Sequence, residues 1–195
     1  IERVAKLIVA RVPTTFNGEP IPTRTPLRTI EATLPSEFAD EEGRLHRTKR
    51  KTRIEIYKPV TEERGYILEL GIPVVATGDL WTANVLQTVP LGLEREDVTP
   101  AFKSKLRAAV LNATHDLLTE EQASEPCVRD AAAQPECTPD AFDSAITARF
   151  SAERTMFDPS DPEANSRALA EGKRLVYGSN MSKGERTNLR RFRSS

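Results

Sequence analysis

The sequence has no apolar run near the roughly 20 residues that a transmembrane helix needs. It also lacks a positively charged start followed by an apolar stretch and a cleavage site. We therefore expect a cytoplasmic protein without a membrane partner. Positive and negative charges nearly balance, because 28 Lys and Arg stand against 29 Asp and Glu. This balance excludes binding to nucleic acids or acidic membranes through the charge of the whole chain, so any basic function must be local.

Cysteine and histidine are scarce. Cys127 and Cys137 have no histidine near them, so they do not form a zinc-binding set. They are either two reduced thiols or a disulfide that closes a short loop. Neither His46 nor His115 has a Ser or Cys nucleophile at a recognisable spacing. The motifs G-x-x-x-x-G-K-[ST], G-x-G-x-x-G and H-E-x-x-H are absent. We therefore expect no catalytic residue, no metal site and no cofactor in this chain.

Alternating apolar and polar residues predict a sheet in the first half of the chain. In the clearest strand, Ile54 and Ile56 point to one face, and Arg53, Glu55 and Tyr57 point to the other. Proline and glycine separate the strands, and residues 35–43 are expected to form a turn. The expected strands cover residues 14–16, 27–34, 51–58, 66–70 and 81–91, with a turn at Asn17-Gly18 after the first.

Helix start signals dominate the second half of the chain. Thr99-Pro100 places an N-cap before a proline at the first helical position, and an apolar stripe from Phe102 to Leu117 follows. An apolar face over residues 1–8 indicates a further helix at the N-terminus. Other helix starts are expected at Thr138-Pro139, Asp161-Pro162 and the capping box Ser182–Glu185, with a short strand over residues 174–177.

These patterns predict an α+β fold, with a mixed or antiparallel sheet and helices packed on it, followed by a mainly helical C-terminal region. The boundary that we predict gives an α+β domain over residues 1–118 and a helical extension over residues 119–195. The first residue is Ile1 rather than Met, which indicates a processed, trimmed or partial chain.

Two local clusters of cations stand out. The run from Arg44 to Arg53 supplies the candidate anion-binding residues, which are Arg47, Lys49, Arg50, Lys51 and Arg53. The run could bind phosphates in a salt-dependent way, or it could be a solvated hairpin arm beside the acidic residues 40–42. No aromatic residue interleaves it, which argues against a base-stacking surface. Arg186, Arg190 and Arg193 share one face of the last expected helix, where they could bind an acidic partner or complement the helix dipole.

The segment 65–112 carries a family resemblance. Two strand-like runs are broken by Gly71-Ile72-Pro73 and lead into the helix after Thr99. This arrangement resembles the region that follows the nucleotide-binding domain in Bergerat-fold (GHKL-type, histidine kinase-like) ATPases, the superfamily of gyrase B, MutL and the type IIB topoisomerases. In these proteins the region is a transducer domain with an S5-like fold.

The resemblance also implies candidate nucleotide-sensing residues. Gln87 and Thr88 are similar to the first two residues of the Gln-Thr-Lys loop of gyrase B, but Val89 stands where the family has the lysine that contacts the γ-phosphate. Arg95 is the only cation between Trp81 and Phe102, so it is the candidate for that role.

We therefore expect a non-catalytic coupling fragment of a larger ATP-binding protein, which relays nucleotide state to partner domains. The Asp-x-Gly-x-Gly motif and the Gly-rich lid of these ATPases do not occur in this chain. By the same resemblance, the parent protein would therefore bind ATP and Mg²⁺ in a separate, N-terminal ATPase domain. That ATPase domain would be the partner of this chain, and a homodimer is possible. The alternative is a nucleic-acid-binding module that uses residues 44–53.

Overall fold

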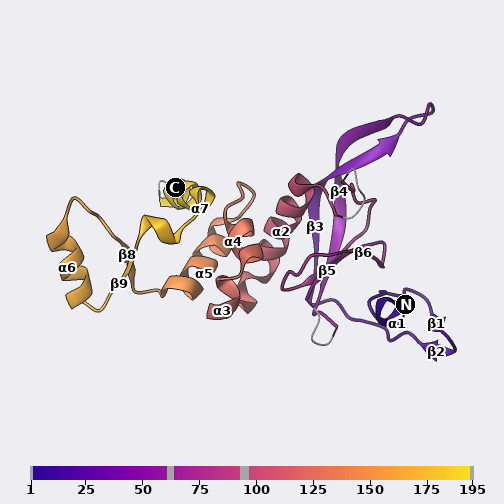
Figure 1. The fold of residues 1–195 in the computed structure, drawn as a ribbon, viewed down its shortest axis with the longest axis horizontal. Coiled ribbons are helices and arrows are strands. Elements are labelled where there is room, and N and C mark those ends of the chain that lie inside the picture. The colour runs from indigo at the N-terminus through magenta and orange to yellow at the C-terminus, as the bar shows by residue number, and fades with distance from the viewer. Residues whose placement is uncertain (1, 61–63, 93–96, 194–195) are drawn as a thin grey trace. The chain divides into compact units, whose positions relative to one another are not determined.

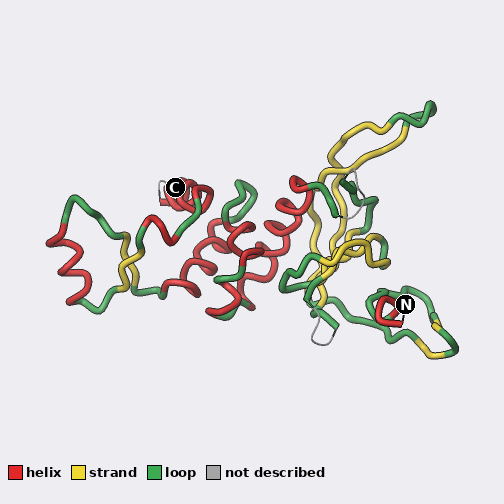
Figure 2. Tube along the Cα trace, viewed as in Figure 1, coloured by secondary structure: helices red, strands yellow, loops and turns green. Residues whose placement is uncertain are grey.

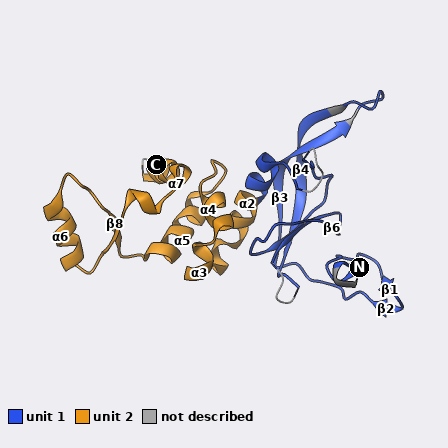
Figure 3. Cartoon of the chain, viewed as in Figure 1, with its two compact units in different colours: residues 1–106 blue, residues 107–195 orange. Residues whose placement is uncertain are grey.

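A computed structural model describes residues 2–60, 64–92 and 97–193 (Figure 1). The chain forms two compact units, residues 1–106 and residues 107–195 (Figure 3). The first unit contains the larger sheet, and the second is mainly helical (Figure 2). The predicted α+β fold with a helical C-terminal part is therefore confirmed, whereas the domain boundary at residue 118 and the S5-like relationship stay predictions.

The sheet of the first unit has five strands in the order β3-β4-β7-β5-β6. It is mixed, because β5 and β7 run parallel while the other neighbouring strands are antiparallel. The strands are β3 (Arg28–Ala39), β4 (Leu45–Tyr57), β5 (Tyr66–Glu69), β6 (Ile72–Ala76) and β7 (Thr82–Val85). The strand expected over residues 81–91 thus ends at Val85.

Strand β3 is longer than expected and runs through Pro35 into the segment predicted as a turn. Proline can occupy this position because β3 is an edge strand, so one side of it has no neighbour that requires an N–H donor. Gly71 interrupts the strand, as predicted, and the sheet continues in β6, which contains Pro73. Gly71 and Leu70 adopt positive φ, of 93° and 52°, in a tight turn that joins β5 to β6.

The alternation of β4 holds for its isoleucines, because Ile54 and Ile56 are fully buried. Tyr57 lies on the face opposite the isoleucines, as predicted, and only 3% of it is exposed, because it packs there against Val9 and Leu68. The N–H of Val9 donates to the Gly71 carbonyl at 2.9 Å. The N-terminal segment therefore packs over the face of the sheet that carries Tyr57 and Leu68. The alternation of residues along the strand could not predict this contact.

The segment before β3 contains a short helix and a hairpin. Helix α1 (Glu2–Ala5) is shorter than the apolar face over residues 1–8 suggested. Strands β1 (Thr15–Phe16) and β2 (Glu19–Pro20) pair through a turn in which Asn17 and Gly18 both have positive φ. This geometry confirms the Asn-Gly turn, because these two residue types tolerate left-handed backbone best.

The second unit is built on the predicted helix starts. Thr138 and Asp161 accept hydrogen bonds from the backbone N–H groups of Ala141 and Ala164 and so cap α5 and α6. Helix α2 (Pro100–Thr114) begins in the first unit. The other elements are η1 (His115–Leu117), α3 (Glu120–Ala123), α4 (Pro126–Ala132), α5 (Pro139–Phe150), α6 (Pro162–Ala170), η2 (Gly178–Asn180), α7 (Lys183–Arg193) and the parallel pair β8 (Arg154–Met156) and β9 (Arg174–Val176).

The capping box of α7 also supplies a buried charge to this unit. Ser182 Oγ accepts from the Glu185 N–H at 3.2 Å, and Glu185 Oε2 accepts from the Ser182 N–H at 2.6 Å. The other oxygen of this fully buried carboxylate accepts from the Arg149 guanidinium at 2.6 Å. The helix start is therefore tied to α5 by an ion pair shielded from water.

Candidate functional site

The predicted basic run lies in a two-stranded ribbon. Strand β4 pairs with β7 only over residues 54–57, whereas its ladder with β3 comprises twelve residue pairs. Nine of these pairs, from Glu31↔Arg53 to Ala39↔Leu45, continue beyond the part of β4 that β7 covers. Figure 1 shows this part of β3 and β4 extending away from the rest of the sheet. We call it the β3–β4 ribbon.

Four of the five candidate cations share one face of the ribbon. Side chains alternate along a strand, so Arg47, Lys49, Lys51 and Arg53 lie on the same side, about 6.7 Å apart from one to the next. All four are exposed. We call this surface the cationic face. Arg50 belongs to the opposite face, where it pairs with Leu34 of β3.

The opposite face of the ribbon is largely turned toward the protein near its base. Leu34, Ser36 and Thr52 are 1%, 6% and 6% exposed. These residues have the strand parity of Ile54, which places them on the core side of the ribbon. Near the sheet, the side of the ribbon that carries Leu34, Ser36 and Thr52 is buried. The cationic face is therefore the side that is accessible to solvent there.

Two glutamates of β3 partly neutralise the cationic face. Lys51 Nζ lies 2.6 Å from Glu31 Oε2, and this contact lowers the pKa of Glu31. Arg47 Nε lies 3.8 Å from Glu37 Oε1, and 90% of the Arg47 side chain is exposed. Exposed ion pairs of this kind contribute little and exchange readily. Lys49 faces Pro35 and has no ion pair within the described residues, so the face keeps a net positive charge.

Acidic residues at the tip of the ribbon form hydrogen bonds and an ion pair within the turn that joins its two strands. Asp40 accepts hydrogen bonds from the N–H groups of Glu42 and Arg44, and its other oxygen contacts His46 Nε2 at 2.7 Å. The hydrogen bond with His46 lowers the pKa of Asp40 most, followed by that with the Arg44 N–H. Arg44 also pairs with Glu42 at 2.8 Å. Asp40 and Glu42 are therefore engaged by His46 and by groups of the turn itself.

The structure places one aromatic residue on the ribbon that the spacing of the basic run did not reveal. Phe38 of β3 pairs with His46 of β4, and their rings stack with centroids 5.4 Å apart. Phe38 is 54% exposed. Phe38 is not part of the run from Arg44 to Arg53. Only the register between β3 and β4 places it beside that run.

The residues suggested by the ATPase resemblance have separate environments. Gln87 is 3% exposed, and its Nε2 donates to the Pro35 carbonyl at 3.0 Å. Thr88 is exposed, whereas Val89 is buried and its N–H donates to Glu69 at 2.8 Å. Arg95 lies outside the described residues. A nucleotide-sensing role for Gln87, Thr88 and Arg95 therefore stays a prediction.

The second predicted cation cluster is partly used in packing. Arg186 donates to the carbonyls of Gly178 and Met181 at 2.7 and 2.8 Å, which holds the start of α7. Arg190 and Arg193 are exposed. The face expected from helical spacing therefore contains one structural arginine, so its charge is less available than the sequence suggested.

Cys127 and Cys137 are free, buried thiols, which resolves the two interpretations of the pair. Among the described residues, no group of three or more His, Cys, Asp or Glu side chains could hold a metal ion. His115 Nδ1 lies 2.9 Å from Ser144 Oγ. This contact joins residues 29 positions apart, so sequence spacing could not reveal it.

The fold and the site together define an α+β protein with a cationic β-ribbon. No family model, curated protein or solved structure was found to match this chain. Within the described residues, no helix has both the length and the apolar character required to span a membrane.

Proposed function

We propose that this chain binds the phosphate backbone of nucleic acid through the cationic face of the β3–β4 ribbon. The observation that supports this function best is the arrangement of Arg47, Lys49, Lys51 and Arg53. These four exposed cations occupy alternate positions on one face of a ribbon that projects beyond the sheet. A solvated hairpin arm would also expose charges, but nothing requires it to collect them on one side.

The dimensions of the ribbon suit a duplex. The major groove of B-DNA is about 12 Å wide and admits a two-stranded β-ribbon. From Arg47 to Arg53 the cationic face spans about 20 Å, which equals the rise of about six base pairs along the helix axis at roughly 3.4 Å each. The contacts proposed here are with phosphates, which carry no sequence information directly. Binding should therefore show little sequence preference.

The test is the salt dependence of binding. With three or four phosphate contacts, log K should fall with log salt at a slope of about −2.7 to −3.6, because each contact releases counterions. Affinity should then drop about 40- to 150-fold between 50 and 200 mM salt. Fluorescence anisotropy with a labelled duplex and a single strand of the same length measures both values.

Two triple variants with equal loss of charge separate a specific face from general attraction. Changing Lys49, Lys51 and Arg53 to Gln should reduce the slope to about −1, because one cation of the face remains. The control changes Arg44, Arg50 and Lys58 to Gln, which are exposed cations outside the cationic face. The control should keep most of the slope. Equal losses in both variants, or binding that ignores salt, would refute the proposal.

The coupling role implied by the resemblance to GHKL ATPases is a separate proposal. It concerns Gln87, Thr88 and Arg95 rather than the ribbon, so it neither requires nor excludes nucleic-acid binding. We rank it second, because the contacts of Gln87 are with Pro35 inside the unit.

A further inference from the structure

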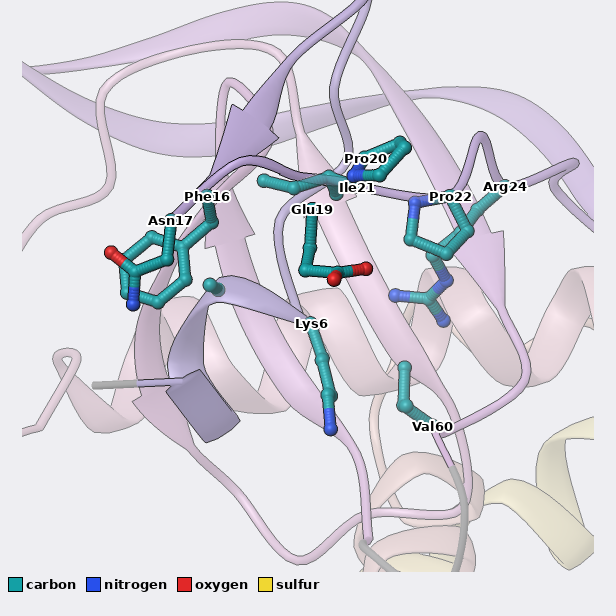
Figure 4. A pocket seen from close by; sticks show the side chains of 10 residues that line it. Lys6, Phe16, Asn17, Glu19, Pro20, Ile21, Pro22, Arg24 and Val60 are labelled. Carbon is teal, nitrogen blue, oxygen red and sulfur yellow. The ribbon is translucent and has the colours of Figure 1, made fainter.

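Two features of the first unit lie outside the cationic face and are open to solvent. One is a cavity of about 680 Å³, lined by the segment around Lys6, the β1–β2 hairpin and the chain that leads to β3 (Figure 4). Lys6 and Glu19 carry opposite charges on its wall, and both are exposed. Charges in water interact weakly, so this pair gives the cavity little preference for a ligand of one charge. The other feature is Phe38, which lies on the β3–β4 ribbon and therefore close to the surface with a proposed function.

Phe38 lies where the protein stops covering the reverse side of the ribbon. Leu34 and Ser36 precede it on the same face of β3 and are 1% and 6% exposed, whereas Phe38 is 54% exposed. The side chain of His46, which pairs with Phe38 from β4, is 50% exposed. Toward its tip, the ribbon (Figure 1) is therefore accessible on both sides, with cations on one side and an aromatic pair on the other.

Contacts within the tip of the ribbon hold this aromatic pair. The rings of Phe38 and His46 stack with an angle of 26° between their planes. His46 Nε2 in turn contacts Asp40, which also accepts from two N–H groups of the turn. Phe38 is thus supported by His46 while more than half of the residue stays exposed. Proteins hold unpaired bases by combining cations with exposed aromatic rings, because every base has a π face that can stack.

A continuous duplex cannot use both sides of this ribbon. Neighbouring base pairs cover the faces of each base in a duplex, and taking a base out of the stack costs free energy. Phe38 also lies on the opposite side of the ribbon from Arg47 and Lys49. A partner that contacts both surfaces must therefore pass on both sides of the ribbon. Two strands that separate from a duplex have this geometry, because one can place its phosphates on the cations while the other places a base on Phe38.

We infer that the ribbon recognises the junction where a duplex opens into two single strands, with Phe38 stacking on an unpaired base. This inference rests on the proposed function, because the cationic face has to hold the phosphates. Phosphate contacts are the same along any duplex, whereas a stacked base marks the place where pairing ends. Stacking on an aromatic side chain tightens binding about 5- to 150-fold per base. One stacked base therefore predicts a preference of at least about fivefold for the junction.

Two labelled forks of equal length test this inference. One has normal nucleotides in both single-stranded arms, and the other has abasic nucleotides at the first positions of both arms. The forks carry the same phosphates and differ only in the bases available for stacking. In fluorescence anisotropy, the whole chain should bind the normal fork at least about fivefold more tightly. Phe38→Ala should abolish this difference and keep the salt slope on a continuous duplex, because the cationic face is unchanged.

Further variants keep the test decisive. Phe38→Tyr retains the ring and should retain the difference between the forks, whereas Phe38→Leu should lose most of it. If Phe38→Ala also weakened duplex binding, this second pair would decide, because both variants keep a large side chain. Leu169→Ala, which removes a 58% exposed apolar side chain from α6, should have no effect.

The outcomes separate this inference from the proposed function. Equal affinity of the unmodified protein for the two forks, with salt-dependent duplex binding intact, would overturn the inference alone. A difference between the forks that survives in both Phe38→Ala and Phe38→Leu would overturn the role of Phe38. If neither the duplex nor the forks bound in a salt-dependent way, the proposed function would fail and the inference with it.

Discussion

Removing the negative charge of Glu185 is the sharpest test of how the second unit is held together. The carboxylate is fully buried, and its Oε1 lies 2.6 Å from Arg149 NH1. Arg149 is only 8% exposed. The Glu185→Gln substitution keeps the shape of the side chain and an oxygen that can accept from the Ser182 N–H. It therefore removes the charge together with the oxygen that accepts from Arg149, because an amide has only one oxygen, and leaves Arg149 as a buried cation without its counterion.

The magnitude follows from what Arg149 retains. Removing one partner of a buried ion pair costs about 3–5 kcal/mol, because the remaining charge is not compensated. Arg149 still donates to the Asn180 carbonyl at 3.0 Å, and its guanidinium lies 4.3 Å from the centroid of the Phe150 ring. These contacts favour the lower end of the range, so we expect a loss of about 3 kcal/mol in the free energy of unfolding. For a chain of this size, that loss corresponds to a fall in Tm of about 6–12 °C.

Urea denaturation followed by far-UV circular dichroism measures this loss, because most of the described helices belong to the second unit. Glu171→Gln is the matched control. Glu171 pairs with Lys173 at 2.7 Å, but both side chains are exposed to solvent, so the urea midpoint should stay unchanged. Adding Arg149→Met to Glu185→Gln should recover part of the stability, because the unpaired charge is then gone. A loss below about 1 kcal/mol in the single variant would refute the reasoning.

Two further predictions concern titrating groups. Burial, followed by the hydrogen bond to Glu55, raises the pKa of Tyr57 to about 12 from 10.0. As pH rises, the unfolded chain loses this proton before the folded chain does. The free energy of unfolding should therefore fall between pH 10 and 12, by at most about 1.4 kcal/mol per pH unit. In urea titrations at several pH values, Tyr57→Phe should remove this part of the pH dependence. Burial also raises the pKa of Cys137 to about 11, although Arg191 opposes the shift. At pH 8 its thiolate fraction should be roughly 200-fold below that of a free cysteine, so a Cys127→Ser variant should react with a disulfide reagent at least that much more slowly when folded than in urea. Equal rates in the two states would contradict this.

Local signals in the sequence were sufficient for much of the fold. The caps at Thr138, Asp161 and Ser182 and the turn at Asn17-Gly18 depend on interactions within a few residues, and each occurs as predicted. Strand alternation around Ile54 is likewise a local pattern. Such features form because the side chain and the backbone group that it satisfies are neighbours in the chain.

Strand length and register required the tertiary structure. Pro35 reads as a turn signal, yet it lies inside β3 because an edge strand tolerates a missing donor. Tyr57 shares a strand face with Arg53 and Glu55, yet it is buried because the N-terminal segment packs against it. In both cases the deciding neighbour is a segment distant in sequence, and no local pattern contains it.

The candidate sites show the same division. The sequence by itself determined that the charge of the chain balances and that its cations concentrate in the run from Arg44 to Arg53. Only the pairing of β3 with β4 decided that four of them share an exposed face and that Arg50 leaves it. The physical reason is that a site is defined by distances and burial, which depend on how segments remote in sequence pack together.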